Sequence, residues 1–226
     1  MAIPSKKAHK MISVLLVDDH SIVRYGLRQM LSADGFDIVG EAKTGVEAIA
    51  MTHKMRPDVV LMDLNMPDMD GFSASLLLLN STLHVKILVM STQESPIVPV
   101  CLLKSGVLGY ISKGVDSKIL TEAIKAVSEG KQYFENHRFL IDTISNSALA
   151  TLSSRELQIV LMITRGVNTR SIAEKICLSQ KTVQANLRVL LKKLGLKNTI
   201  ALVHLAIQQK LLDPDMTQLA HEHRRW

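Results

Sequence analysis

The chain has 226 residues and a formal net charge of +6 at pH 7, which is enough length for one or two domains. No apolar run reaches the roughly 18 residues of a transmembrane helix, and the basic start of the chain lacks an apolar signal core, so we expect a cytoplasmic protein. Cys101 and Cys177 lie far apart in the sequence, which favours two reduced thiols over a disulfide or a zinc site.

The charge is distributed unevenly along the chain. Residues 1–137 carry 14 Lys and Arg against 15 Asp and Glu, a net charge of −1, whereas residues 138–226 carry 13 against 6, a net charge of +7. A nearly neutral module joined to a basic one suggests that the second module binds nucleic acid. Acidic lipid is the alternative partner, but the basic part has no strongly amphipathic helix with aromatic anchors.

Strand and helix patterns alternate five times along the first part of the chain. Apolar runs typical of buried parallel strands occur at residues 13–17, 38–39, 59–62, 85–90 and 108–111. Helical spacing occurs at residues 21–32, 45–54, 72–80 and 116–130. A stretch with two prolines should delay or distort the helix after the fourth strand, and in the second helix Val46, Ile49 and Ala50 should face the core. The pattern predicts an α/β domain with a doubly wound, five-stranded parallel sheet.

Polar side chains follow four of these strands at the point where each strand ends. They are Asp18 and Asp19 after the first strand, Asp63 after the third, Ser91 after the fourth and Lys113 after the fifth. Because the carboxyl ends of the strands in such a sheet lie on one edge, we expect these side chains to converge there.

Three crowded carboxylates repel one another, and a hard divalent cation with oxygen ligands, such as Mg²⁺, is the natural compensation. Together with a lysine and a hydroxyl, they could hold a tetrahedral oxyanion against a carboxylate nucleophile. This constellation predicts phosphoryl transfer to an aspartate.

The basic module has the pattern of four helices. It opens at Leu152 with a capping box of Ser153 and Glu156, and helices are expected at residues 154–165, 169–176, 180–194 and 199–211. The second and third of these are joined by a three-residue turn, which is typical of a helix-turn-helix. The third helix has an apolar face and an opposite face suited to the major groove, composed of Lys181, Gln184, Ala185, Arg188 and Lys192.

One helix-turn-helix unit contacts too few base pairs to define a unique binding site in a genome. We therefore expect a homodimer on an inverted repeat of double-stranded DNA. The final helix offers one stripe for the dimer contact, composed of Ile200, Val203, His204 and Ile207.

The first part of the chain resembles a response-regulator receiver domain. The family's motifs appear in order and at its spacing: the Asp-Asp pair, VVLMDLNMPDMDG, a Ser after the fourth strand and a Lys after the fifth. The resemblance implies that Asp63 accepts a phosphoryl group from a sensor histidine kinase and that Lys113 pairs with the phosphate. It also implies that the Ser91 hydroxyl moves toward the phosphoryl group and that the Tyr110 ring follows it inward. It also implies Mg²⁺ ligands, namely Asp18 through water, Asp19, Asp63 and the backbone carbonyl of Asn65.

The basic module resembles the four-helix DNA-binding domain of the NarL/FixJ (LuxR-type) regulators, from LSSREL through LSQKTVQANLRVLLKKL. The Pro96/Pro99 segment, GYISKG and ELQIVLMITRG resemble the GacA/UvrY/LetA branch of that family most closely. The resemblance implies that base edges face Gln184, Ala185 and Arg188, that phosphates face Lys181, Thr182 and Lys192, and that the final helix makes the dimer contact.

These observations predict a response regulator of a two-component system. Its domains should be an N-terminal extension (1–11), a receiver (12–131), a linker (132–149), the DNA-binding domain (150–212) and a tail (213–226). The alternative is a ligand-sensing LuxR-type transcription factor that phosphorylation does not control, but its sensor should have an aromatic-lined pocket, and residues 1–137 hold few aromatics. An aspartyl-phosphate phosphatase would need a second carboxylate two residues after its nucleophile, where this chain has Asn65.

Overall fold

The computed structural model describes residues 11–67, 69–92, 97–135, 147–164, 166–176 and 178–209. Most of the predicted N-terminal extension and linker, the whole predicted tail, and Pro96 and Cys177 lie outside these residues. The chain forms two compact units, one containing the residues up to Ser91 together with Lys113–Tyr133, and the other Thr92–Ser112 together with the chain from Phe134 onward. No helix of the described part is both long and apolar enough to span a membrane.

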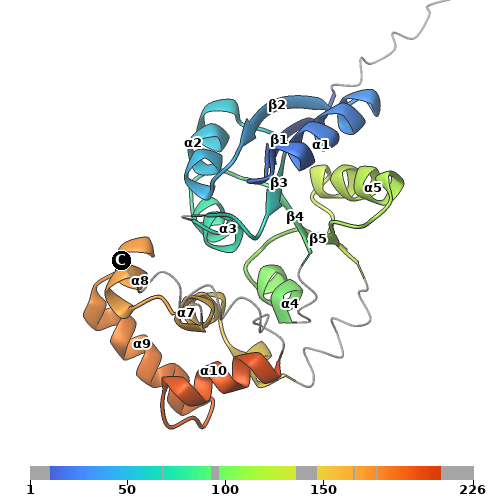
Figure 1. Ribbon diagram of the computed structural model, residues 1–226. Coiled ribbons are helices and arrows are strands. Elements are labelled where there is room, and N and C mark those ends of the chain that lie inside the picture. Colours follow the sequence, from blue (N-terminus) through green and yellow to red (C-terminus); the bar gives the residue numbers. More distant parts are fainter. Residues whose placement is uncertain are drawn as a thin grey trace, which may run out of the picture. The chain divides into compact units, whose positions relative to one another are not determined.

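The described residues form a sheet of six strands in the order β2-β1-β3-β4-β5-β6 (Figure 1). The strands are β1 (Ser13–Val17), β2 (Asp37–Ala42), β3 (Val59–Asp63), β4 (Ile87–Ser91), β5 (Gly109–Ser112) and β6 (Tyr133–Phe134). β1 pairs in parallel with β2 and β3, and β3 pairs in parallel with β4. The predicted parallel α/β sheet is therefore confirmed. The structure adds β6, whose two residues are too few to form a recognisable sequence pattern.

Helices of the first unit cover both faces of this sheet: α1 (Ser21–Ala33), α2 (Gly45–Met55), α3 (Gly71–Leu79) and α5 (Ser117–Ser128). α4 (Ile97–Lys104) belongs to the second unit. α1 and α5 lie on one face, where the Thr121 hydroxyl donates to Asp34 at 2.9 Å, and α2 and α3 lie on the other (Figure 1). All five residues of β3 and of β4 are buried, which explains why their sequences are continuously apolar up to the terminal polar residue. The helix after β4, α4, begins at Ile97 and contains Pro99, and residues 93–96, on which the predicted delay depends, lie outside the described residues.

The prediction for the inward face of α2 was wrong. Val46 and Ala50 are exposed and Ile49 is only half-buried, whereas Ala48 and Thr52 are buried. The Thr52 hydroxyl donates to the Ala48 carbonyl at 2.7 Å, so the helix itself satisfies the buried polar group. Small residues on this face let α2 lie close to β1 and β2. Because the buried residues are small and the larger apolar ones lie elsewhere on the helix, the hydrophobic pattern predicted the wrong face.

The C-terminal helices follow a short 3₁₀ helix, η1 (Ala148–Thr151). They are α7 (Ser154–Thr164), α8 (Thr169–Lys175), α9 (Gln180–Lys193) and α10 (Thr199–Gln208). The predicted capping box is present: Glu156 Oε2 accepts from the Ser153 backbone N–H at 2.7 Å, and Ser153 Oγ accepts from the Glu156 N–H at 3.3 Å. α7, α8 and α9 enclose one apolar cluster, composed of Ile159, Met162, Ile172, Ala173, Ile176 and Val183. The predicted four helices and helix-turn-helix are confirmed.

Gly71, the first residue of α3, contacts the end of β3 so closely that a side chain has no space. A Cβ atom there would lie 1.7 Å from the backbone oxygen of Asp63, whereas a Cβ on Gly26, in α1, would meet nothing within 4 Å. We expect Gly71→Ala to lower the free energy of unfolding by about 3 kcal/mol or more, because backbone must move. Gly26→Ala, the control, should raise it by about 0.5–1 kcal/mol. Urea unfolding measures both, and a neutral Gly71→Ala would contradict this packing.

Candidate functional site

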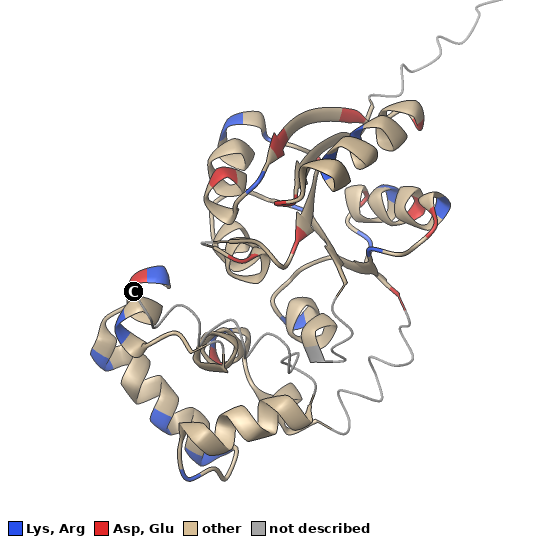
Figure 2. Ribbon diagram, viewed as in Figure 1, with Lys and Arg blue, Asp and Glu red and all other residues tan. Residues whose placement is uncertain are grey.

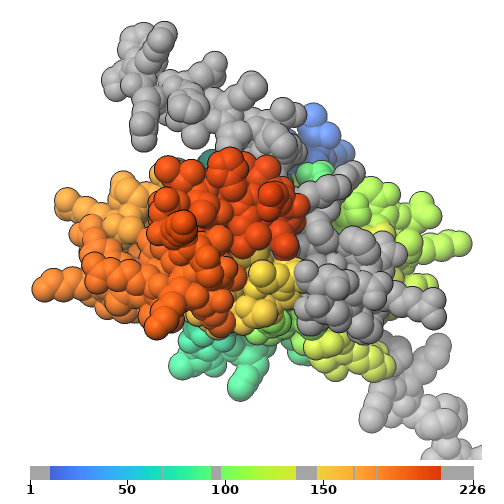
Figure 3. Space-filling view, turned by 90° about the horizontal axis from the view of Figure 1, so that it is seen from below, coloured from blue at the N-terminus to red at the C-terminus, as the bar shows by residue number. Residues whose placement is uncertain are grey.

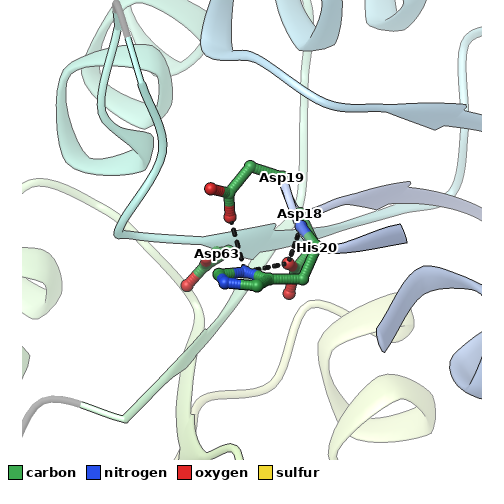
Figure 4. A group of neighbouring side chains, drawn as sticks. All are labelled: Asp18, Asp19, His20 and Asp63. Carbon is green, nitrogen blue, oxygen red and sulfur yellow. Dashed lines mark hydrogen bonds and ion pairs between the residues drawn. The ribbon is translucent and has the colours of Figure 1, made fainter. Parts of the chain in front are cut away.

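Three aspartates meet at the carboxyl end of the central strands. The parallel register pairs Val17 of β1 with Met62 of β3, so the next residues, Asp18 and Asp63, lie side by side. Candidate ligand atoms of Asp18, Asp19, Asp63 and His20 all lie within 4.8 Å of one another (Figure 4). The structure thus brings together the three carboxylates that the strand ends predicted.

His20 is a member of this cluster that the sequence did not reveal. Its Nδ1 lies 2.8 Å from Asp19 Oδ1 and 3.3 Å from Asp18 Oδ1, although the side chain is largely exposed (Figure 4). The Asp18 carboxylate also accepts from the His20 backbone N–H at 2.9 Å. The only available signal was that His20 directly follows the Asp-Asp pair, and a histidine at a helix N-terminus has many other uses.

Lys113, which follows β5, connects the two most buried carboxylates. Its Nζ lies 2.7 Å from Asp18 Oδ2 and 3.0 Å from Asp63 Oδ2. Its backbone N–H donates to the Ser91 carbonyl at 3.0 Å, which fixes the start of the lysine at the end of β4. Asp63 is 2% exposed, so this ion pair is largely shielded from water.

The electrostatics of the site leave negative charge uncompensated. Burial raises the pKa of Asp63, and the hydrogen bond and charge of Lys113 offset only part of that rise. Burial alone would lower the pKa of Lys113, but its hydrogen bonds to Asp18 and Asp63 outweigh burial and the pKa is raised. Asp63 Oδ1 is buried, and no side chain of the described residues donates to it. The Lys113 ammonium therefore pairs with two of the three clustered carboxylates, and the three together form a set of oxygen donors suited to a hard divalent cation.

The other predicted receiver residues lie in the strands or just after them. Ser91 is the last residue of β4 and is buried, Tyr110 is buried in β5, and Asn65 is exposed in the loop after β3. The structure thus places the hydroxyl, the aromatic ring and the asparagine on the elements that the sequence predicted.

A second candidate surface lies on α9, where Lys and Arg predominate over Asp and Glu (Figure 2). The six predicted contact residues are all exposed: Lys181, Thr182, Gln184, Ala185, Arg188 and Lys192. On the opposite side of the helix, Val183 and Leu190 are fully buried, as the helical spacing predicted. Ser179 caps the helix, its hydroxyl accepting from the Thr182 N–H at 3.1 Å. The polar face is therefore available to a partner.

Whereas α9 exposes charged and polar residues, α10 exposes a mainly apolar stripe. Ile200 is 67% exposed and Ile207 is 38% exposed, while Leu202 and Ala206 are fully buried. His204, between the two isoleucines, is also exposed. In the space-filling view, the orange and red side chains of α9 and α10 form part of the molecular surface (Figure 3).

Comparison with known families and proteins matches both parts of the chain. Residues 14–125 match the family model of the response regulator receiver domain, and residues 150–206 match that of the bacterial regulatory proteins of the luxR family. The response regulator UvrY of Escherichia coli K12 is 37% identical over 213 residues, which cover 91% of this chain and 98% of UvrY. The chain belongs to the two-component response regulators with a LuxR-type DNA-binding domain.

Further similarities agree with this membership. The response regulator GacA of Pseudomonas viridiflava is 35% identical over 211 residues, covering 90% of this response regulator and 99% of GacA. Among solved structures, RcsB of Salmonella enterica serovar Typhimurium, bound to promoter P1flhDC in the presence of the phosphomimetic BeF3-, superposes with a TM-score of 0.67 at 26% identity. That likeness covers 87% of this chain and 98% of RcsB. The family is one of transcription regulators, which confirms the predicted class of function and argues against a ligand-sensing module in place of the receiver.

Lys113→Met should destabilise the response regulator, because it leaves buried carboxylates without their cation. We expect the free energy of unfolding at pH 7 to fall by about 3–5 kcal/mol, the usual cost of removing one partner of a buried ion pair. The loss should shrink from pH 7 to pH 5. A carboxyl whose pKa is raised in the folded state binds a proton there before the unfolded chain does, so acid favours the folded variant.

Urea unfolding at the two pH values checks both effects. Lys118→Met, on the exposed side of α5, is the matched control and should change stability by less than about 0.5 kcal/mol. A Lys113→Met variant that is as stable as the wild type at pH 7, or that loses more stability at pH 5 than at pH 7, would contradict this role.

Proposed function

We propose that a sensor histidine kinase phosphorylates Asp63, and that phosphorylation makes this cytoplasmic response regulator bind an inverted repeat of double-stranded DNA as a homodimer. The observation that supports the proposal is the buried Asp63 carboxylate, paired with Lys113 and adjacent to two further carboxylates. We assign the receiver to residues 12–131 and the DNA-binding domain to residues 150–212. The extension (1–11), the linker (132–149) and the tail (213–226) complete the proposed organisation.

The residues around Asp63 suit a magnesium ion. Asp19, Asp63 and the backbone carbonyl of Asn65 would hold Mg²⁺, with Asp18 acting through water, because all of these donors are oxygens and the carboxylates carry excess negative charge. When bound, the ion would neutralise charge on the carboxylates and on the incoming phosphoryl oxygens.

In the proposed transfer, one carboxylate oxygen of Asp63 forms a bond to phosphorus, and the bond from phosphorus to the kinase histidine breaks. The leaving imidazole keeps the bonding electron pair and takes up a proton. Phosphorylation removes the negative charge of the Asp63 carboxylate itself. Lys113 then pairs with a phosphoryl oxygen, which replaces this lost partner of the ammonium. The Ser91 hydroxyl would move toward the phosphoryl group, and Tyr110, which is already buried, is the aromatic residue that would switch with it.

Asp63→Asn tests the acceptor directly. With acetyl phosphate and Mg²⁺, intact mass spectrometry should show the gain of one phosphoryl group in the wild type and no gain in the variant, because an amide cannot act as the nucleophile. Asp116→Asn changes an exposed aspartate before α5 and should be phosphorylated like the wild type. A phosphoryl group that is still gained by Asp63→Asn would refute the assignment of Asp63 as the acceptor.

We propose that α9 enters the major groove. Gln184, Ala185 and Arg188 would face base edges, and Lys181, Thr182 and Lys192 would face phosphates. Their exposure supports this, as does the likeness to RcsB, whose structure was solved bound to a promoter. Lys193 is less suited to a phosphate contact, because it is ion-paired with Glu156 at 2.9 Å.

Arg188 and Lys192 should respond differently to substitution. Arg188→Ala should weaken specific binding by about 1–3 kcal/mol and relax one base position, whereas Lys192→Ala should weaken all sequences alike and lower the salt slope by about one. Fluorescence anisotropy on operator and random duplexes at several salt concentrations measures these effects. Identical behaviour of the two variants on both duplexes would refute the assignment of the groove face.

For the dimer contact we propose the stripe on α10, composed of Ile200, Val203, His204 and Ile207. Two exposed isoleucines on one helix give an apolar surface whose burial would stabilise association. Ile200→Asp should leave the fold intact, because Ile200 is exposed, and should abolish the dimer formed with BeF3-. Analytical ultracentrifugation measures the fraction of dimer, and a variant that dimerises like the wild type would contradict the assignment of the contact to α10.

A further inference from the structure

Arg24 connects three parts of the first unit beside the acidic cluster. Its side chain is 15% exposed, its Nη1 donates to the backbone carbonyl of Asp18 at 2.6 Å, and its Nε donates to Glu41 Oε2 at 3.3 Å. The guanidinium thus links α1 to the loop after β1 and to β2. The receiver site as described above does not use this residue.

Glu41 holds Arg24 in this orientation. The second oxygen of Glu41, Oε1, accepts from Arg28 Nε, so the carboxylate lies between two guanidinium groups. The hydrogen bond from Arg28 lowers the pKa of Glu41, against the opposing effect of burial, and the carboxylate stays ionised near neutral pH. An ionised, half-buried partner restricts the planar Arg24 fork more than water would.

The carbonyl that Arg24 holds belongs to the peptide between the two acidic residues. The other groups of Asp18 are also fixed: its N–H donates to the Ala42 carbonyl at 3.1 Å, and its Oδ2 pairs with Lys113. A peptide group is planar, so the direction of the Asp18 carbonyl also sets the direction in which the chain enters Asp19. A rotation of this peptide would move the Asp19 carboxylate relative to Asp63.

We propose that Arg24 is a positioning residue for the divalent cation, acting through the Asp18–Asp19 peptide. The inference rests on the proposed function, in which these aspartates hold Mg²⁺. Positioning and charge predict opposite results. As a nearby positive charge, Arg24 repels a cation, so its removal would tighten metal binding; as a support for the peptide, its removal weakens metal binding.

Three variants of the full-length protein separate these effects. Arg24→Met removes the guanidinium, Arg24→Lys keeps the charge but not the fork, and Arg28→Met removes the neighbour that contacts Glu41 but not the loop. Isothermal titration with Mg²⁺ should show affinity reduced about tenfold or more for Arg24→Met, as for other residues that orient metal ligands. The reduction should be smaller but clear for Arg24→Lys, and smaller still for Arg28→Met, which leaves the contacts of Arg24 with Asp18 and Glu41 in place.

Phosphorylation by acetyl phosphate supplies a second readout. In Arg24→Met and Arg24→Lys, the Mg²⁺ concentration that gives half the maximal rate should rise in proportion to the lost affinity, while the rate at saturating Mg²⁺ changes little. A purely structural role would lower the melting temperature without moving this concentration, and that result would overturn the proposal.

Unchanged or tighter Mg²⁺ binding by Arg24→Lys also overturns the proposal, and this variant decides the matter if Arg24→Met does not fold. A wild-type protein that binds no Mg²⁺ and gains no phosphoryl group would instead refute the proposed function itself. The two failures are therefore distinguishable.

Discussion

The ammonium of Lys113 lies between two buried carboxylates, and the arrangement of the receiver site depends on this contact. Without it, Asp18 and Asp63 would lie side by side at the ends of adjacent strands without the cation that offsets their repulsion and their loss of water. The lysine reduces this cost but does not remove it, since the pKa of Asp63 remains raised. A site with residual negative charge, closed on one side by a fixed cation, is suited to receive a metal ion and a phosphoryl group together.

The surrounding fold keeps these groups in register. Parallel pairing places the ends of β1 and β3 side by side, and the Lys113 N–H bonds to the last residue of β4. Gly71 allows α3 to begin against the backbone of Asp63, where any side chain would collide. On the other side, Arg24 holds the peptide that follows Asp18. Each of these contacts is made by backbone or by a half-buried group, so the site is built into rigid elements.

The C-terminal helices, α7 to α10, are stabilised in a different way. Their fold depends on apolar packing between α7, α8 and α9 and on side-chain caps at the helix starts, including those formed by Asn168, Ser179 and Asn198. Those caps consume few of the charged residues, so α9 keeps a polar face with Arg188 and Lys192 exposed. A receptor for a small anion needs a buried pocket, whereas a duplex needs an open, basic face.

The sequence by itself determined the alternation of strands and helices, the aspartates and the lysine at the strand ends, and the capping box. These features are local or periodic, and parallel topology brings strand ends to one edge whatever the details of packing. Tertiary structure alone decided which side of α2 is buried, because Ala48 and Thr52 were selected by close approach to the sheet and not by hydrophobicity. It also decided the places of His20 and Arg24 in the site, since their roles come from contacts with Asp19, Asp18 and Glu41 that no spacing along the chain encodes.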